Sequence, residues 1–107
     1  MDLDREKAFA ERLAQLRMRA GISARDMSLS MGQSQGYINK IENLQNLPSM
    51  CGFFYICDYL KITPMEFFDE TLTDPRRIRG IEEKLKKLSE KQLAAVEQLI
   101  DAMLEPM

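Results

Sequence analysis

The sequence contains no histidine and no tryptophan, and only two of its 107 residues are cysteines. Histidine is the usual side chain for acid–base catalysis near neutral pH and, with cysteine, a common zinc ligand. Two thiols without histidine cannot complete a four-ligand zinc site within one chain. A glycine-rich phosphate-binding loop is also missing. We therefore expect no catalytic residues, no metal and no cofactor, and we do not expect an enzyme.

The two cysteines, Cys51 and Cys57, fall six residues apart in a segment with helical periodicity. At a rise of about 1.5 Å per residue their backbones are roughly 9 Å apart, too far for a disulfide within that helix. We predict that both are small core residues.

Long hydrophobic runs are absent, and none approaches the roughly 18 residues that suggest a transmembrane helix. The first residues include Asp2, Asp4 and Glu6 where a signal peptide needs basic residues. We expect no membrane association and a cytoplasmic protein.

An excess of basic charge is absent as well. Fifteen Lys and Arg residues face 17 Asp and Glu residues, which gives a net charge of −2. Residues 1–69 hold eight basic and nine acidic residues, and the remainder holds seven and eight. A surface that binds a polyanion would therefore require a local cluster of Lys and Arg residues, because the chain as a whole is not basic.

Apolar residues recur at helical spacing along most of the chain, and no segment alternates as a strand would. The pattern predicts an all-α fold. Helix ends are indicated by Gly21 and Gly32, and helix starts by serine and threonine N-caps. Five helices are predicted in the first part, over about residues 5–20, 24–31, 35–43, 49–60 and 64–68, with Ser34 as the cap of the third.

The composition changes after Asp69, where proline, threonine and the arginines Arg76, Arg77 and Arg79 gather. We predict a domain over residues 1–69, a linker over 70–80 and a C-terminal helical extension over 81–107. The arginines fit a solvated linker better than a phosphate-binding strand. Ser89 can cap a second helix of the extension.

The extension carries a stripe of apolar residues: Leu93, Val96, Leu99, Ile100 and Met103. Such a stripe exposed to water invites association. It packs either on its own domain or on a second copy of the chain, and we favour a dimer.

Residues 13–68 resemble the Cro/cI-type helix-turn-helix domain of the XRE family, found in phage repressors and bacterial regulators. The segments that carry the resemblance are residues 16–23, the run GQSQGYINKIE at 32–42, residues 48–49 and residues 60–68. The resemblance implies a five-helix, lambda-repressor-like bundle whose third helix lies in the DNA major groove.

Carried over residue by residue, the resemblance implies a DNA-binding surface around the third helix. Gln35 is the expected base reader, because its amide can pair with adenine in a bidentate manner. Gly36 occupies the next reading position without a side chain. The remaining candidates are Ser34, Tyr37, Asn39, Lys40, Asn43 and, in place of a family glutamine at Ala24, Arg25. Of these, Tyr37 is expected to be partly packed at the helix junction, with a hydroxyl that can reach a phosphate.

Three further positions can be compared with the family pattern. Arg17 and Glu42 match an internal ion pair, which assigns them to the scaffold. Leu44 stands where a glycine commonly ends the third helix. A leucine is not expected to take the left-handed conformation.

We expect a homodimeric transcriptional regulator, most simply a repressor that reads a palindromic operator with its third helix. Double-stranded DNA and a second copy, bound through the C-terminal helices, are the expected partners. One alternative is an antitoxin-type regulator whose extension holds a protein partner. Another is a protein-interaction module that kept the fold but lost DNA binding.

Overall fold

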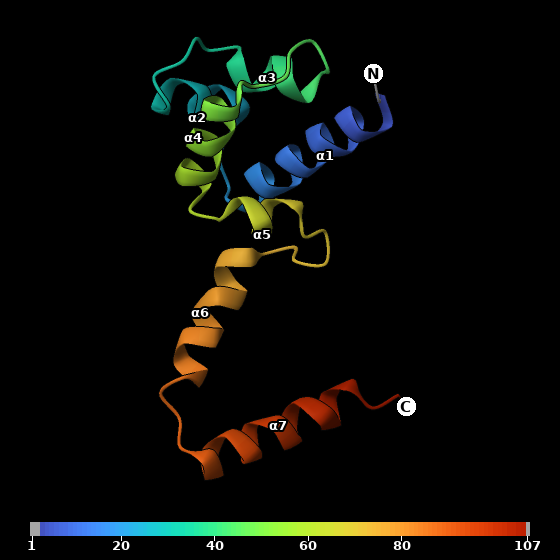
Figure 1. Cartoon of the computed structure of the whole chain (residues 1–107), viewed down its shortest axis with the longest axis vertical. Helices are drawn as coiled ribbons and strands as arrows, with labels where there is room; N and C mark the ends of the chain where they lie inside the picture. The colour runs from blue at the N-terminus through green and yellow to red at the C-terminus, as the bar shows by residue number, and fades with distance from the viewer. Residues whose placement is uncertain (1–2, 107) are drawn as a thin grey trace. The chain divides into compact units, whose positions relative to one another are not determined.

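The computed structural model describes residues 3–106, and in this range it contains α-helices and no strand (Figure 1). The all-α prediction is confirmed. The chain divides into two compact units, with the boundary between Arg76 and Arg77. The helices are α1 (Leu3–Arg19), α2 (Ala24–Ser30), α3 (Tyr37–Glu42), α4 (Met50–Leu60), α5 (Pro64–Phe68), α6 (Pro75–Leu85) and α7 (Glu90–Leu104).

Four helices start at a side-chain cap, as the sequence predicts. In each case a hydroxyl oxygen accepts a hydrogen bond from the backbone N–H three residues later, at 3.0–3.2 Å. Each bond satisfies one of the free amides at a helix start. The capping residues are Ser23, Ser49, Thr63 and Ser89.

The third helix is shorter than predicted, and its predicted cap is wrong. Residues 34–37 form a turn in which the N–H of Tyr37 donates to the carbonyl of Ser34 at 3.1 Å. Gly36 holds the cap position, and no side chain caps the helix there. Gln35 and Gly36 therefore precede α3 and do not form its first turn.

The first four helices each end at a residue with a left-handed backbone. Gly21 and Gly32 do so at φ 74° and 77°, as expected for glycine. Leu44 and Lys61 do so at φ 63° and 58°. The expectation that Leu44 avoids this conformation is thus wrong. The N–H of Gln45 donates to the carbonyl of Lys40 at 2.8 Å, and this terminal hydrogen bond holds the turn.

The core of the first unit lies where α1 to α5 converge. Its fully buried residues include Leu13, Ile38, Ile56 and Phe67. Phe67 meets Phe53 edge to face, with ring centroids 5.1 Å apart. The periodic apolar residues of the sequence thus share one interior.

Arg12 of α1 is buried, although it carries a charge. Its guanidinium donates to the carbonyls of Phe67, Glu66 and Asp69, the last two at 2.8 Å. These carbonyls lie at the end of α5, so the guanidinium joins that end to α1. Burial lowers the pKa of Arg12, and the charges of Asp69 and Glu70 oppose that shift.

The prediction that both cysteines are core residues is confirmed for Cys57 and wrong for Cys51. Cys57 is buried in the core, whereas Cys51 is exposed on α4. Burial, followed by the charge of Asp58, raises the pKa of the Cys57 thiol to about 11. The two positions are six residues apart and fall on different sides of a helix with 3.6 residues per turn.

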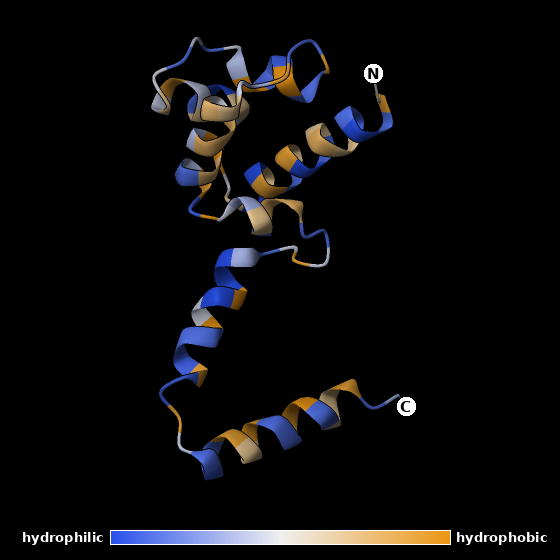
Figure 2. Ribbon diagram, viewed as in Figure 1, coloured by the Kyte–Doolittle hydropathy of each residue, from blue (hydrophilic) through white to orange (hydrophobic). Residues whose placement is uncertain are grey.

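The predicted linker is helical from Pro75, because residues 75–80 form the first half of α6. In the second unit α7 carries its hydrophobic residues along one side (Figure 2). None of the residues of α7 is buried, and in α6 only Pro75 is. Residues 1, 2 and 107, which belong to the predicted outer segments, lie outside the described residues.

Candidate nucleic-acid interface

The helices α2 and α3 pack against each other across the turn at residues 31–36 (Figure 1). A buried serine joins them. The hydroxyl of Ser28 donates to the carbonyl of Ala24 at 2.7 Å and accepts from the N–H of Ile38 at 2.9 Å. The N–H of Ile38 at the start of α3 is thereby satisfied from α2, which fixes the angle between the two helices.

An ion pair joins the C-terminal end of α3 to α1. The guanidinium of Arg17 donates to both carboxylate oxygens of Glu42, at 2.8 and 2.9 Å. The hydrogen bond to Glu42 is the main reason that the pKa of Arg17 is raised. Bidentate pairs of this kind add geometric specificity. The expected scaffold role of Arg17 and Glu42 is confirmed.

The outer side of α3 and of the turns beside it is polar and exposed. Asn39 on α3 and Asn43 at its end are four residues apart and share one side of the helix, and Gln35 is exposed in the turn before it. Lys40 is exposed beside Asn39. The core residues Ile38 and Ile41 hold the opposite side in the interior. The structure therefore brings most of the predicted site residues onto one surface, which we call the amide face.

Two predicted residues lie at the edge of this face. Ser34 is exposed in the turn before α3, and Arg25 is exposed at the start of α2. Arg25 and Lys40 are the cations of this region, and Asp26 lies beside Arg25 in the sequence. The region is only weakly basic, as the overall charge predicts.

Tyr37 belongs mainly to the scaffold. Its side chain is half-buried and packs against the core. A Cβ atom placed on Gly52 would lie 2.7 Å from the Tyr37 hydroxyl oxygen, so the ring fits closely over α4. This is the partly packed position expected at the helix junction, and the DNA contact of Tyr37 stays a prediction.

Gly36 leaves open space on the amide face. A Cβ atom built there would meet only the end of the Lys40 side chain, at 3.8 Å, an ordinary van der Waals distance. A larger side chain at this position would therefore not disturb the packing.

The sequence analysis missed three residues that widen the amide face. Gln33 precedes the turn, and Gln45 and Asn46 follow the end of α3. All three are exposed, and the N–H groups of Gln45 and Asn46 both donate to the carbonyl of Lys40. The density of amides within residues 33–46 was a signal that could have revealed them.

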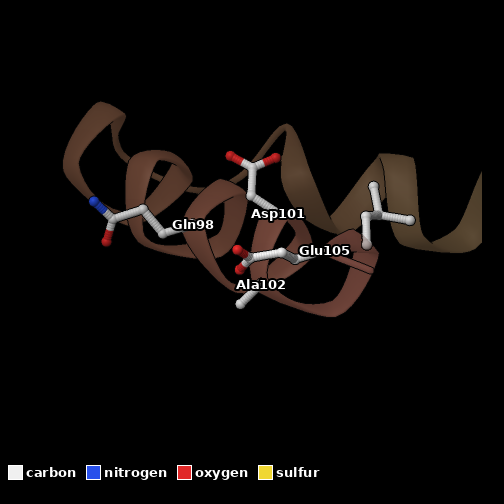
Figure 3. A pocket seen from close by; sticks show the side chains of 5 residues that line it. Gln98, Asp101, Ala102 and Glu105 are labelled. Carbon is white, nitrogen blue, oxygen red and sulfur yellow. The ribbon is translucent and has the colours of Figure 1, made fainter. Parts of the chain in front are cut away.

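Other surfaces of the described residues offer little for chemistry. No group of three or more potential metal ligands occurs in residues 3–106. An apolar hollow is lined by Phe9, Leu47, Met50, Phe53 and Phe68 and lacks an ionisable group. A second hollow is lined by Gln98, Asp101, Ala102, Leu104 and Glu105 (Figure 3). Its walls come from α7 and the residue after it, so it is a stretch of helix surface.

Across the part of the chain that the structure describes, no helix has both the length and the apolar character needed to cross a membrane. Comparisons with family models, with curated proteins and with solved structures find no match to this chain. The function is therefore inferred from the geometry of the amide face.

Proposed function

We propose that the chain is a sequence-specific DNA-binding transcription regulator of the Cro/cI type, with a lambda-repressor-like first unit. The observation that carries this proposal is the amide face of α3. Its side chains are exposed, while Ser28 and the Arg17–Glu42 ion pair fix the helix from behind. A rigid helix with a polar outer side is what reading of the major groove requires.

Gln35 and Asn39 are the proposed base readers. A side-chain amide offers a donor and an acceptor that match the N6 and N7 atoms of adenine. Lys40 can donate to guanine or to a phosphate. We assign phosphate contacts to Asn43, Ser34 and Arg25 at the edge of the face. These contacts position the protein without reading sequence.

The regulator acts as a homodimer paired through the C-terminal helices. Two copies of α3 would enter successive major grooves about 34 Å apart and read a palindromic operator. Repression would follow because the bound dimer blocks access of polymerase. Since few cations line the face, the affinity is expected to fall less steeply with salt than for a strongly basic protein.

The test is selection from random duplexes with the full-length protein, repeated with Gln35→Ala and with Gln98→Ala. We expect an enriched palindrome for the wild type and for Gln98→Ala, which changes an exposed amide of α7. Gln35→Ala should lose or relax the preference at one position of each half-site. If the wild type enriches no sequence at low salt, DNA reading by this chain is refuted.

A protein-interaction module is the second candidate. The net charge of −2 and the exposure of Leu29 on α2, a position where a DNA-facing helix would favour a polar residue, support it. Under this function the selection fails, and Leu29→Ser weakens binding of a partner protein.

A further inference from the structure

The second unit contains two amphipathic segments with the same spacing of apolar residues. One series is Ile78, Ile81, Leu85 and Leu88, in α6 and at its end. The other is Leu93, Val96, Ile100 and Met103 in α7, where Leu99 and Leu104 are apolar residues outside the series. Both series have intervals of three, four and three. This spacing produces a single apolar seam along a helix, as in helical bundles.

These seams are largely uncovered. Ile78, Ile81 and Ile100 are 40–45% exposed, and Met103 is 68% exposed. A soluble monomer rarely leaves a continuous apolar surface of this kind in water. A segment of about 30 residues is also too short to bury a core of its own. We therefore expect the apolar residues of both seams to pack against a partner.

The charges of the second unit differ between its two helices. Residues 75–89, which contain α6 and the turn after it, hold six Lys and Arg against two Glu, a balance of +4. Residues 90–106, which contain α7, hold one Lys against Glu90, Glu97, Asp101 and Glu105, a balance of −3. Asp101 lies on α7, and Glu105 directly follows the helix (Figure 3). The basic segment thus complements the acidic segment of a second copy.

We propose that the second units of two copies form a four-helix bundle in which the basic α6 segment of one chain lies beside the acidic α7 of the other. The four seams would form one shared core. The proposal rests on the dimer of the proposed function and defines its interface. The occupant is a second copy because the unit supplies both the basic and the acidic surface in one chain.

Charge decides which helices are neighbours in this bundle. Placing α7 beside α7 would bring together the four carboxylates of residues 90–106 from each chain against one cation, Lys91, and like charges across an interface oppose pairing. Placing α7 beside the partner's α6 puts opposite charges next to each other. At physiological ionic strength charges interact over about 8 Å, the separation of neighbouring helices in a bundle.

The test measures the mass of the full-length chain by sedimentation equilibrium without DNA. One variant is Lys84→Glu with Lys87→Glu, and the other is Asp101→Lys with Glu105→Lys. Each variant alone should dimerise about tenfold more weakly than the wild type, because its helices carry like charges. Mixed in equal amounts, the two variants should form a heterodimer that weakens with added salt.

Matched controls separate this inference from its alternatives. Lys7→Glu reverses one exposed charge of the first unit and should leave dimerisation unchanged. Ile100→Asp should give a folded monomer. A monomeric wild type, or a mixture that gains nothing over the separate variants, would overturn the proposed bundle. Because no DNA is present, this failure is distinct from a failure of the duplex selection.

Discussion

Both units of the chain consist of amphipathic helices, but the apolar sides of these helices are buried to different degrees. In the first unit the apolar sides of α1 to α5 converge, and Leu13 is fully buried. In the second unit Leu99 of α7 has the same chemistry and is 60% exposed. An amphipathic pattern therefore predicts a helix in both places, but only the first unit contains what the apolar side packs against.

Local signals are equally strong in the two units. Thr63 and Ser89 both form capping boxes, with Glu66 and Gln92 respectively. The helix α7 is thus well specified by its own residues, although none of them is buried. The comparison indicates that stability in the first unit comes from packing, and we propose that association supplies the packing of the second unit.

The largest expected effect contrasts one substitution in the two units. Leu13→Ala should lower the free energy of unfolding by about 2–5 kcal/mol, because it leaves a cavity in the core. Leu99→Ala should change it by less than about 0.5 kcal/mol when the protein is dilute enough to be monomeric. Urea unfolding followed by circular dichroism measures both. Equal losses would contradict the division into a packed and an unpacked unit.

Arg12 offers the next largest contrast, between a buried and an exposed cation. Arg12→Met removes the three hydrogen bonds between α1 and the carbonyls at the end of α5 and should cost about 2–4 kcal/mol. Lys91→Met, at an exposed position of α7, should change stability by less than about 0.5 kcal/mol. A fully stable Arg12→Met protein would show that the guanidinium does not hold α5.

The pKa of Cys57 predicts a loss of stability at alkaline pH. Its folded pKa of about 11 lies above the ordinary value of 9.0, so the folded state retains the proton more strongly. This contribution is complete below pH 9 and disappears as the pH rises to 11, a loss of about 2–3 kcal/mol. In Cys57→Ala the free energy of unfolding should depend less on pH across this range. An unchanged slope in that variant would exclude the thiol as the cause.

Thiol labelling sharpens the same comparison. Cys51 is exposed and should react with a thiol reagent in the folded protein, whereas Cys57 should react only after unfolding. Counting reactive thiols in the native chain and in Cys51→Ser checks this.

The smallest expected effect concerns the ends of α3 and α4. Leu44→Gly and Lys61→Gly should each stabilise the first unit by about 0.5–1 kcal/mol, since glycine takes a positive φ without strain. Ala102→Gly, in the middle of α7, should instead lower helicity. Chemical unfolding measures the first two and circular dichroism the third. Destabilisation by Leu44→Gly would mean that the leucine side chain contributes packing that outweighs the strain.

Much of the fold could be predicted from the sequence because its signals are local. Caps and periodic apolar residues define six of the helix starts closely enough to place the core. The exceptions depend on tertiary structure. The burial of Arg12 requires the end of α5, 54 or more residues away. The positive φ of Leu44 is held by hydrogen bonds at the end of α3, and its residue type gave no sign of it.

The candidate site was predictable to a similar extent. The shared side of Asn39 and Asn43 follows from helical spacing, whereas Gln35 lies in the turn before α3. The structure leaves all three side chains exposed. The position of Tyr37 over Gly52 could not be predicted, because it depends on how α3 meets α4. The serine bridge of Ser28 is likewise a contact between two helices and has no local signature.

The most direct test of the central claim is a titration of the isotope-labelled full-length chain with duplex DNA at low salt, followed by NMR. Our account predicts that amide signals of residues 33–46 shift, including those of Gln35, Asn39 and Lys40, and that signals of α7 stay in place. Shifts confined to α7, or none within residues 33–46, would contradict the account.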